Sequence, residues 1–287
     1  MIKKAVIPAA GWGTRFLPIT KAIPKEMLPI IDKPALSYIV KEAALAGIEE
    51  VILIVSDNKA AIKDYFDRNM ELEQFLIEKD KSDDISFIDN NNYGVKITYV
   101  KQEEQLGLGH AILQAEKYIN NEPFAILLGD DVFVSVKKPA IEQLINAYKL
   151  KKSNILGTMH VPDDQTHLYG ICIPKNDDNN SLKELKGVVE KPKGKAPSNS
   201  AIAGRYVLTP TIFDYLKNQT KGAGGEIQLT DAILRMMETE KVYSLDIDAR
   251  RYDIGSKTGY LEAIIDFSLK RDDLSKYVKK FIKSKNS

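Results

Sequence analysis

A glycine-containing turn directly follows the first apolar run of the chain. Residues 5–8 (Ala-Val-Ile-Pro) predict a buried first strand, and the turn that follows contains Gly11 and Gly13. Glycine has no Cβ, so a backbone built this way can approach a ligand closely, and its exposed N–H groups can bind an anion. Arg15 and Lys25 add positive charge nearby. The segment therefore predicts an α/β fold with a phosphate-binding loop after its first strand.

Two common phosphate-binding loops are excluded by the same residues. The dinucleotide fingerprint G-x-G-x-x-G requires a third glycine where this chain has Phe16. The Walker A loop requires Gly-Lys followed by Ser or Thr, and the first loop contains no such sequence. A Gly-rich strand-to-helix turn with two surface cations is the alternative that remains. The combination of two glycines, a threonine and two cations favours phosphate binding over that alternative.

Composition limits the function classes. The 287 residues carry a formal net charge of +1, which gives no reason to expect electrostatic binding of nucleic acid or of a membrane surface. A single cysteine, Cys172, excludes an intramolecular disulfide, and the three histidines argue against a His-based metal centre. No apolar run approaches the length of a membrane span or of a signal peptide core. We expect a cytoplasmic protein.

Short apolar runs alternate with amphipathic helical patterns. The predicted strands are 5–8, 50–55, 95–100 and 124–128, and the predicted helices are 35–46, 58–69 and 109–118. Repeated βα units of this kind predict a Rossmann-like α/β fold with a mixed, mostly parallel sheet and helices on both faces. The polar residues 78–92 are expected to form a surface insertion, and 177–180 a polar turn.

The C-terminal tail is basic and amphipathic. Its apolar residues share one helix face: Leu274, Tyr277, Val278, Phe281 and Ile282. This face could dock on its own domain or form a subunit contact, and the sequence leaves both open. We expect a single catalytic domain over residues 1–265 and a basic helical tail over 266–287.

Carboxylates at strand ends suggest a metal site. Asp130 follows the buried strand 124–128, and the carboxyl ends of strands are where α/β sheets bind ligands. Mg²⁺ takes one or two carboxylates together with phosphate oxygens, so Asp130 is the candidate ligand and Asp253 a weaker second one. A turn or helix-capping role is the alternative for each.

Two further segments carry candidate binding residues. Gln102 has an amide that can bond a base edge as donor and acceptor, and Gly107 permits close approach before a helix. Glu190 could accept hydrogen bonds from sugar hydroxyls, and Lys191 could bind a phosphate. A helix-capping loop and a surface ion pair are the respective alternatives.

Motifs along nearly the whole chain resemble one family. The chain is similar to the bacterial UTP–glucose-1-phosphate uridylyltransferases, within the sugar-nucleotidyltransferase family. The resemblance is carried, in family order, by residues 8–18, 21–29, 107–111, 189–192, 196–199, 204–206, 225–232 and 252–256. Departures are modest: Trp12, Ile254 and the polar stretch 78–92. The resemblance implies the fold of the nucleotide-diphospho-sugar transferases.

The resemblance also implies residue roles. Ala9, Ala10, Gly11 and Gly13 would contact the nucleotide, and Gln102 and Gly107 would read uracil. Arg15 and Lys25 would hold the triphosphate and the departing pyrophosphate. Asp130 and Asp253 would bind Mg²⁺. Glu190 would bind glucose hydroxyls and Lys191 the glucose 1-phosphate, while Gly170 and Gly204 would line the sugar site.

The implied reaction is Mg²⁺-dependent uridylyl transfer from UTP to glucose 1-phosphate, in an enzyme that forms a homo-oligomer, a dimer or a tetramer. Three alternatives stay open on the residues alone. They are a transferase for another base or sugar, such as a thymidylyltransferase, a non-catalytic sensor of sugar nucleotides, and a nicotinamide-dependent oxidoreductase. The last is disfavoured by Phe16 at the third glycine position.

Overall fold

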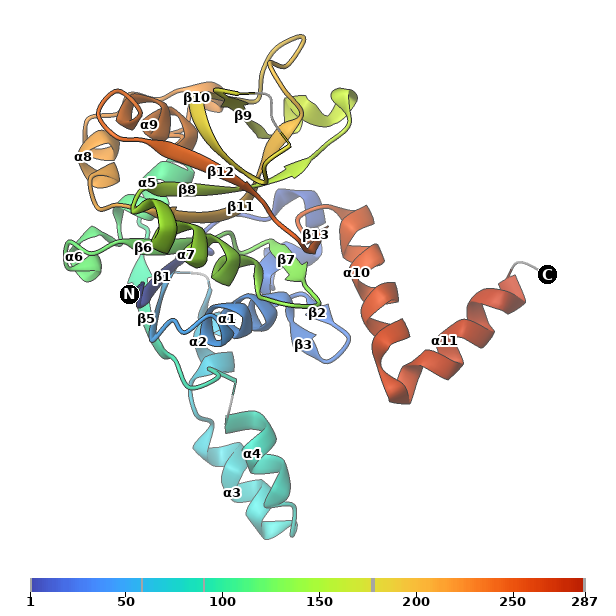
Figure 1. Ribbon diagram of the computed structural model, residues 1–287. Coiled ribbons are helices and arrows are strands. Elements are labelled where there is room, and N and C mark those ends of the chain that lie inside the picture. Colours follow the sequence, from blue (N-terminus) through green and yellow to red (C-terminus); the bar gives the residue numbers. More distant parts are fainter. Residues whose placement is uncertain (1, 58, 90, 177–178, 286–287) are drawn as a thin grey trace.

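A nine-stranded mixed sheet runs through the whole molecule (Figure 1). The computed structural model describes residues 2–57, 59–89, 91–176 and 179–285. The strand order is β5-β4-β1-β6-β11-β8-β12-β10-β9. Two small two-stranded sheets, β7 with β13 and β2 with β3, lie beside it.

The first half of the sheet is parallel. It contains β1 (Lys4–Pro8), β4 (Glu50–Val55), β5 (Lys96–Lys101) and β6 (Phe124–Leu127). Strands β1, β4 and β6 are buried on both sides because neighbouring residues face opposite cores: Ala5 and Ile7 face one cluster, and Val6 faces the other. The edge strand β5 is only partly buried. This burial explains their near-continuous apolar sequences, and the parallel pairing of all four strands places their carboxyl ends at one edge.

The second half is mainly antiparallel. It contains β8 (Asn154–His160), β9 (Gly170–Pro174), β10 (Leu182–Glu190), β11 (Ser200–Leu208) and β12 (Val242–Asp246). Only β8 and β12 pair in parallel here; β11 pairs antiparallel with both β6 and β8. The sheet is mixed, as predicted, but parallel pairing is concentrated in its first half, from which the predicted strands came.

Helices cover both faces of the sheet. One face is packed by α1 (Ala35–Leu45) and α7 (Ala140–Lys151), the other by α5 (Leu108–Leu113), α8 (Ile212–Lys217) and α9 (Leu229–Met236). The short helix α6 (Glu116–Ile119) follows α5, so the single helix expected over 109–118 is two helices. Short 3-10 turns follow β1 at Thr14–Phe16, Ile19–Lys21 and Lys25–Met27, and others lie at Asp163–Leu168 and Ala223–Gly225.

The structure differs from two expectations between residues 58 and 92. The helix expected over 58–69 is α2 (Ala60–Phe66); Asn58 lies outside the described residues, as do 177 and 178 of the expected polar turn. The polar stretch 78–92, which lacked a clear helical period, is largely helical. It contributes α4 (Asp83–Asp89), which packs on α3 (Met70–Glu78) to form a hairpin that projects from the body in Figure 1. Among the hairpin side chains whose burial the structure describes, only Glu73 is buried, and this is why the amphipathic pattern was weak.

The C-terminal residues form two helices joined at Arg271. Helix α10 (Lys257–Lys270) packs on β13 (Arg250–Asp253), and α11 (Asp272–Lys285) packs on α10 and buries no residue. The expected division at 265/266 therefore falls inside α10, and the separate tail helix begins at Asp272. Among the described residues, no helix is both long and apolar enough to cross a membrane.

Candidate functional site

Two adjoining cavities lie at the carboxyl ends of the central strands. The first, of about 460 Å³, is formed mainly by the loop after β1 and the loop before α5. The second, of about 600 Å³, is formed mainly by the ends of β9, β10, β11 and β13. Four residues line both: Leu108, Leu128, Asp130 and Glu226. Asp130 thus stands at the border between the two.

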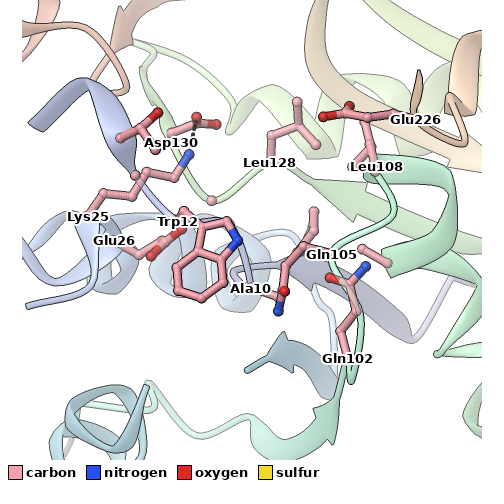
Figure 2. Close-up of a pocket in the computed structure, with 17 residues that line it drawn as sticks. Ala10, Trp12, Lys25, Glu26, Gln102, Gln105, Leu108, Leu128, Asp130 and Glu226 are labelled. Carbon is pink, nitrogen blue, oxygen red and sulfur yellow. Dashed lines mark hydrogen bonds and ion pairs between the residues drawn. The ribbon is translucent and has the colours of Figure 1, made fainter. Parts of the chain in front are cut away.

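Figure 2 shows the first cavity. Trp12 stands over it with 63% of its surface exposed, Lys25 and Asp130 lie at one end, and Gln102 lies at the other. This arrangement offers polar amides at one end and charge at the other, which suits an elongated molecule with an anionic tail.

A buried ion pair contacts the backbone of the loop after β1. Lys59 Nζ donates to the carbonyl oxygen of Gly11 at 2.8 Å and to Glu26 Oε2 at 2.8 Å. Both side chains are nearly inaccessible to solvent. Burial raises the pKa of Glu26 and lowers that of Lys59, while the charge of each opposes the shift of the other. The Lys59 ammonium therefore fixes the orientation of the Gly11 peptide. The sequence patterns did not identify this pair.

Gln102 is oriented by the next helix. Its side-chain nitrogen lies 2.9 Å from His110 Nδ1, and His110 Nε2 lies 3.2 Å from the Gln114 amide. Gly107 has φ +112°, and a Cβ there would lie 2.7 Å from Glu226 Cβ. Only glycine fits this position, because both the backbone angle and the packing on residue 226 exclude a side chain.

A cation and a carboxylate meet at the border of the cavities. Lys25 Nζ lies 2.6 Å from Asp130 Oδ2. Burial would lower the pKa of Lys25, but the charges of Asp130 and Glu26 outweigh it and raise that pKa to about 12. Burial would raise the pKa of Asp130, but Lys25 holds it below its usual value. Both groups are thus charged at neutral pH.

Asp253 is brought beside Asp130 by the β7–β13 ribbon. Strand β7 (Asp131–Val134) pairs with β13 so that Asp253 lies opposite Asp131. A Cβ on Gly255 would lie 2.8 Å from Asp130 Oδ2 and 3.0 Å from Asp253 Oδ1, so the two carboxylates face the same space. In the described residues no group of three His, Cys, Asp or Glu side chains forms a metal cage. Two carboxylates fit a Mg²⁺ ion whose other ligands are substrate oxygens and water.

The second cavity contains a carboxylate that can accept hydrogen bonds from hydroxyl groups, and a cation. Glu190 Oε2 accepts a hydrogen bond from Thr230 Oγ1 at 2.7 Å, beside Gly170. Lys191 adopts φ +43°, which is uncommon for a residue with a side chain, and its ammonium lies 3.5 Å from Glu190 Oε1 with half of the side chain exposed. Such local strain is typical of functional positions.

A second ion pair forms the floor of this cavity. Arg251 contacts Asp131 Oδ1 through Nε at 2.6 Å and through Nη2 at 2.5 Å, and its Nη1 lies 3.4 Å from the Tyr169 hydroxyl. Burial raises the pKa of Asp131 to about 6, against the opposing charge of Arg251. Gly204 has φ +68°, and a Cβ there would clash with Asp131. These contacts were not predicted from the sequence.

A fully buried arginine lies next to the place where the two cavities meet. Arg205 Nε and Nη2 bind Glu42 at 2.9 and 2.7 Å, and Nη2 also donates to the Asp131 carbonyl oxygen at 2.7 Å. Glu42 Oε1 in turn accepts from the N–H of Ile141, at the start of α7. Residues 204–206 were noted only as a motif; burial of the arginine could not be inferred from them.

The structure brings together nearly all the predicted site residues. The first cavity is lined by Ala10, Gly11, Gly13, Lys25, Gln102, Gly107 and Asp130. The second is lined by Arg15, Asp130, Gly170, Glu190, Lys191, Gly204 and Asp253. Ala9 does not line either; it is buried beneath the loop, and its N–H donates to Ile54.

Fold and site together define a nucleotidyl transferase. The family model for nucleotidyl transferases matches residues 4–268, and the chain belongs to that family. It is 52% identical over 283 residues to a UTP–glucose-1-phosphate uridylyltransferase of Staphylococcus epidermidis, covering 98% of both chains.

Two solved structures extend this similarity to bound molecules. A UTP-bound UGPase from Acinetobacter baumannii is 40% identical, with a TM-score of 0.91 and coverage of 98% of this chain and 99% of that one. A UDP-glucose pyrophosphorylase complexed with UDP-glucose is also 40% identical, with a TM-score of 0.85 and coverage of 94% and 100%.

Proposed function

We propose that this chain is a UTP–glucose-1-phosphate uridylyltransferase, which converts UTP and α-D-glucose 1-phosphate to UDP-glucose and pyrophosphate. The observation that carries the proposal is the position of Asp130 between two cavities, with Lys25 on one side and Lys191 on the other. The relatives bound to UTP and to UDP-glucose support the same assignment.

The first cavity would hold the nucleotide. Gln102 and Gly107 would read uracil, and the backbone of Ala9, Ala10, Gly11 and Gly13 would contact the nucleoside, Ala9 from beneath. Arg15 and Lys25 would bind the triphosphate, and both line a small cavity of about 160 Å³ next to Asp130 that would receive the pyrophosphate.

The second cavity would hold the sugar phosphate. Glu190, held by Thr230, would accept hydrogen bonds from glucose hydroxyls, and Lys191 would bind the phosphate. Gly170 and Gly204 would leave room for the sugar ring. The attacking oxygen belongs to a phosphate monoester, which is already nucleophilic, so the chain needs no general base.

Repulsion between two anionic substrates is the main barrier to this reaction. Lys25, Arg15 and Lys191 would neutralise phosphate charge, and the two cavities would align the sugar phosphate for in-line attack on the α-phosphorus. Nucleotidyl transferases generally use a divalent metal ion. Here it would be Mg²⁺, held by Asp130 and Asp253, and it would supply Lewis-acid stabilisation of phosphate charge.

Three related features belong to this proposal. The residues up to Lys270 would form one catalytic domain, with α11 as an appended helix. The chain would form a homo-oligomer. It would act in the cytoplasm, where its single cysteine, which is buried, stays reduced.

A pyrophosphate-release assay tests the activity. Purified protein is incubated with glucose 1-phosphate and each of UTP, dTTP, ATP, CTP and GTP. We expect release with UTP at a rate at least about tenfold above ATP, CTP and GTP, since one well-formed polar contact to a base is worth about 1.4 kcal/mol or more. Release with dTTP should also be slower, because dTTP has an added C5 methyl group and lacks the 2′-hydroxyl. Preference for dTTP would identify a thymidylyltransferase. UDP-glucose binding without pyrophosphate release would identify a sensor.

The substitution Lys59→Met tests whether Lys59 positions the loop after β1, which would bind the nucleotide. The Gly11 carbonyl oxygen would lose its charged donor, worth about 1.5–3 kcal/mol, so we expect the KM for UTP to rise about tenfold or more. The KM for glucose 1-phosphate should change by less than about twofold, because Lys59 contacts no residue of the second cavity. Lys63→Met, on the exposed side of α2, is the matched control. Equal rises in both KM values would contradict a role at the nucleotide loop.

A further inference from the structure

The chain contains a single tryptophan, and this residue lines the first cavity. Trp12 lies between Gly11 and Gly13 in the loop after β1, and Figure 2 shows its ring standing over the cavity. Its surface is 63% exposed. Among the residues that the structure describes, none stacks on the indole and none accepts a hydrogen bond from its Nε1–H. An apolar ring of this size is costly to leave in water, so it gains free energy when a ligand covers it.

The backbone on both sides of this tryptophan is held by side chains. The carbonyl oxygen of Gly11 accepts a hydrogen bond from the buried Lys59 ammonium at 2.8 Å. The carbonyl oxygen of Gly13 accepts one from Thr20 Oγ1, also at 2.8 Å. The ring is therefore placed over the cavity before any ligand binds. Contact with a ligand then orders only the side chain, which keeps the entropic cost of that contact low.

The chemistry of the ring decides which part of a nucleotide it can cover. In the chain, the proposed nucleoside contacts Ala10 and Gly11 precede Trp12, and the proposed triphosphate ligand Arg15 follows it. The face of an aromatic ring carries partial negative charge, so it does not attract phosphate oxygens. It packs well on the face of a base, because every base has a π-face on which an aromatic side chain can stack. The indole therefore suits the nucleoside and not the triphosphate.

We propose that the indole of Trp12 packs on the nucleoside of bound UTP and supplies part of the affinity for the nucleotide. This inference rests on the proposed function and adds a residue to its nucleotide site. Gln102 and Gly107 would read the edge of uracil, while Trp12 covers the nucleoside. Hydrogen bonds to the edge select the base, whereas stacking strengthens the binding of any base. Loss of the ring should therefore weaken the binding of UTP and of CTP by similar factors and leave the preference between them unchanged.

Tryptophan fluorescence of the full-length protein tests this contact without turnover. UTP, UMP or inorganic tripolyphosphate is added in the absence of glucose 1-phosphate, and calorimetry measures the binding of each. Because the chain has one tryptophan, the emission reports on Trp12 alone. We expect a saturable change with UTP and UMP and none with tripolyphosphate, which supplies the phosphates without the nucleoside. Unchanged emission at concentrations of UTP that bind, or an equal change with tripolyphosphate, would overturn the inference.

The affinities of variants are the second measurement. Trp12→Ala should raise the Kd of UTP and of UMP about 5- to 150-fold, which corresponds to about 1–3 kcal/mol for one stacked base. The Kd of tripolyphosphate should change by less than about twofold. Trp12→Phe keeps an aromatic ring and should recover most of the affinity.

Ile19→Ala is the matched control, since Ile19 is an exposed apolar residue just after the same loop that lines none of the cavities of the site. Its affinities should equal those of the unsubstituted protein. Unchanged binding of UMP by Trp12→Ala is incompatible with the inference. Failure of the proposed function is a different result: the emission responds to UTP as expected, but no pyrophosphate is released once glucose 1-phosphate is added.

Discussion

Asp130→Asn is expected to lower kcat by about 10²–10³-fold, as does the loss of one group that stabilises transition-state charge. Asparagine keeps the shape of the side chain but removes its charge. Because Lys25 holds the pKa of Asp130 below its usual value, the wild-type carboxylate remains charged through neutral and mildly acidic pH. The substitution therefore removes a permanent anion from the point where the two cavities meet.

The measurement needs a readout besides turnover. Binding of Mn²⁺ in the presence of UTP, followed by electron paramagnetic resonance, reports the metal site directly and should weaken together with kcat. Asp64→Asn, on the exposed side of α2, is the matched control and should change neither quantity. Full activity of the Asp130→Asn variant would remove Asp130 from the mechanism.

Lys191→Ala is expected to raise the KM for glucose 1-phosphate by about 10–100-fold. A hydrogen bond to a charged group is worth about 1.5–3 kcal/mol, which corresponds to this range. Alanine has the same Cβ as lysine at φ +43°, so the backbone strain is unchanged and the effect reports the ammonium. The KM for UTP should change little, because Lys191 lines only the second cavity.

Lys195→Ala is the matched control for this variant, since Lys195 is an exposed lysine in the same loop that lines neither cavity. Lys191→Arg should recover part of the affinity, because it restores the charge with different geometry. If the KM values for both substrates were unchanged in Lys191→Ala, the assignment of the sugar-phosphate site would be wrong.

Local sequence signals predicted the parts of the fold in which strands are buried on both faces. Strands such as β4 appear as continuous apolar runs, and α1 appears as an amphipathic helix that ends before Gly47. The individual strands of the antiparallel half were not predicted, and their pairing order, such as β11 between β6 and β8, is set by tertiary contacts and not by a local pattern. The α3–α4 hairpin escaped prediction because it has little buried surface to impose a helical period.

The residues of the candidate site also fall into two groups, those that the sequence identified and those that it did not. Residues in short motifs, such as Gly11, Lys25 and Lys191, could be named from the sequence. Their supporting partners could not, because Lys59, Arg251 and Glu42 are single charged residues without a pattern, and only the fold shows that they are buried against the site. A buried charge is indistinguishable in sequence from a solvated one.

The buried Arg205–Glu42 pair has a consequence for motion. It joins β11, which carries Gly204 of the second cavity, to α1, and Glu42 also accepts from the N–H of Ile141 at the start of α7. Removing one partner of such a buried pair costs about 3–5 kcal/mol, because the other charge is left uncompensated. A movement of β11 relative to α1 would leave these buried charges uncompensated, so the pair opposes a hinge between the two halves of the site.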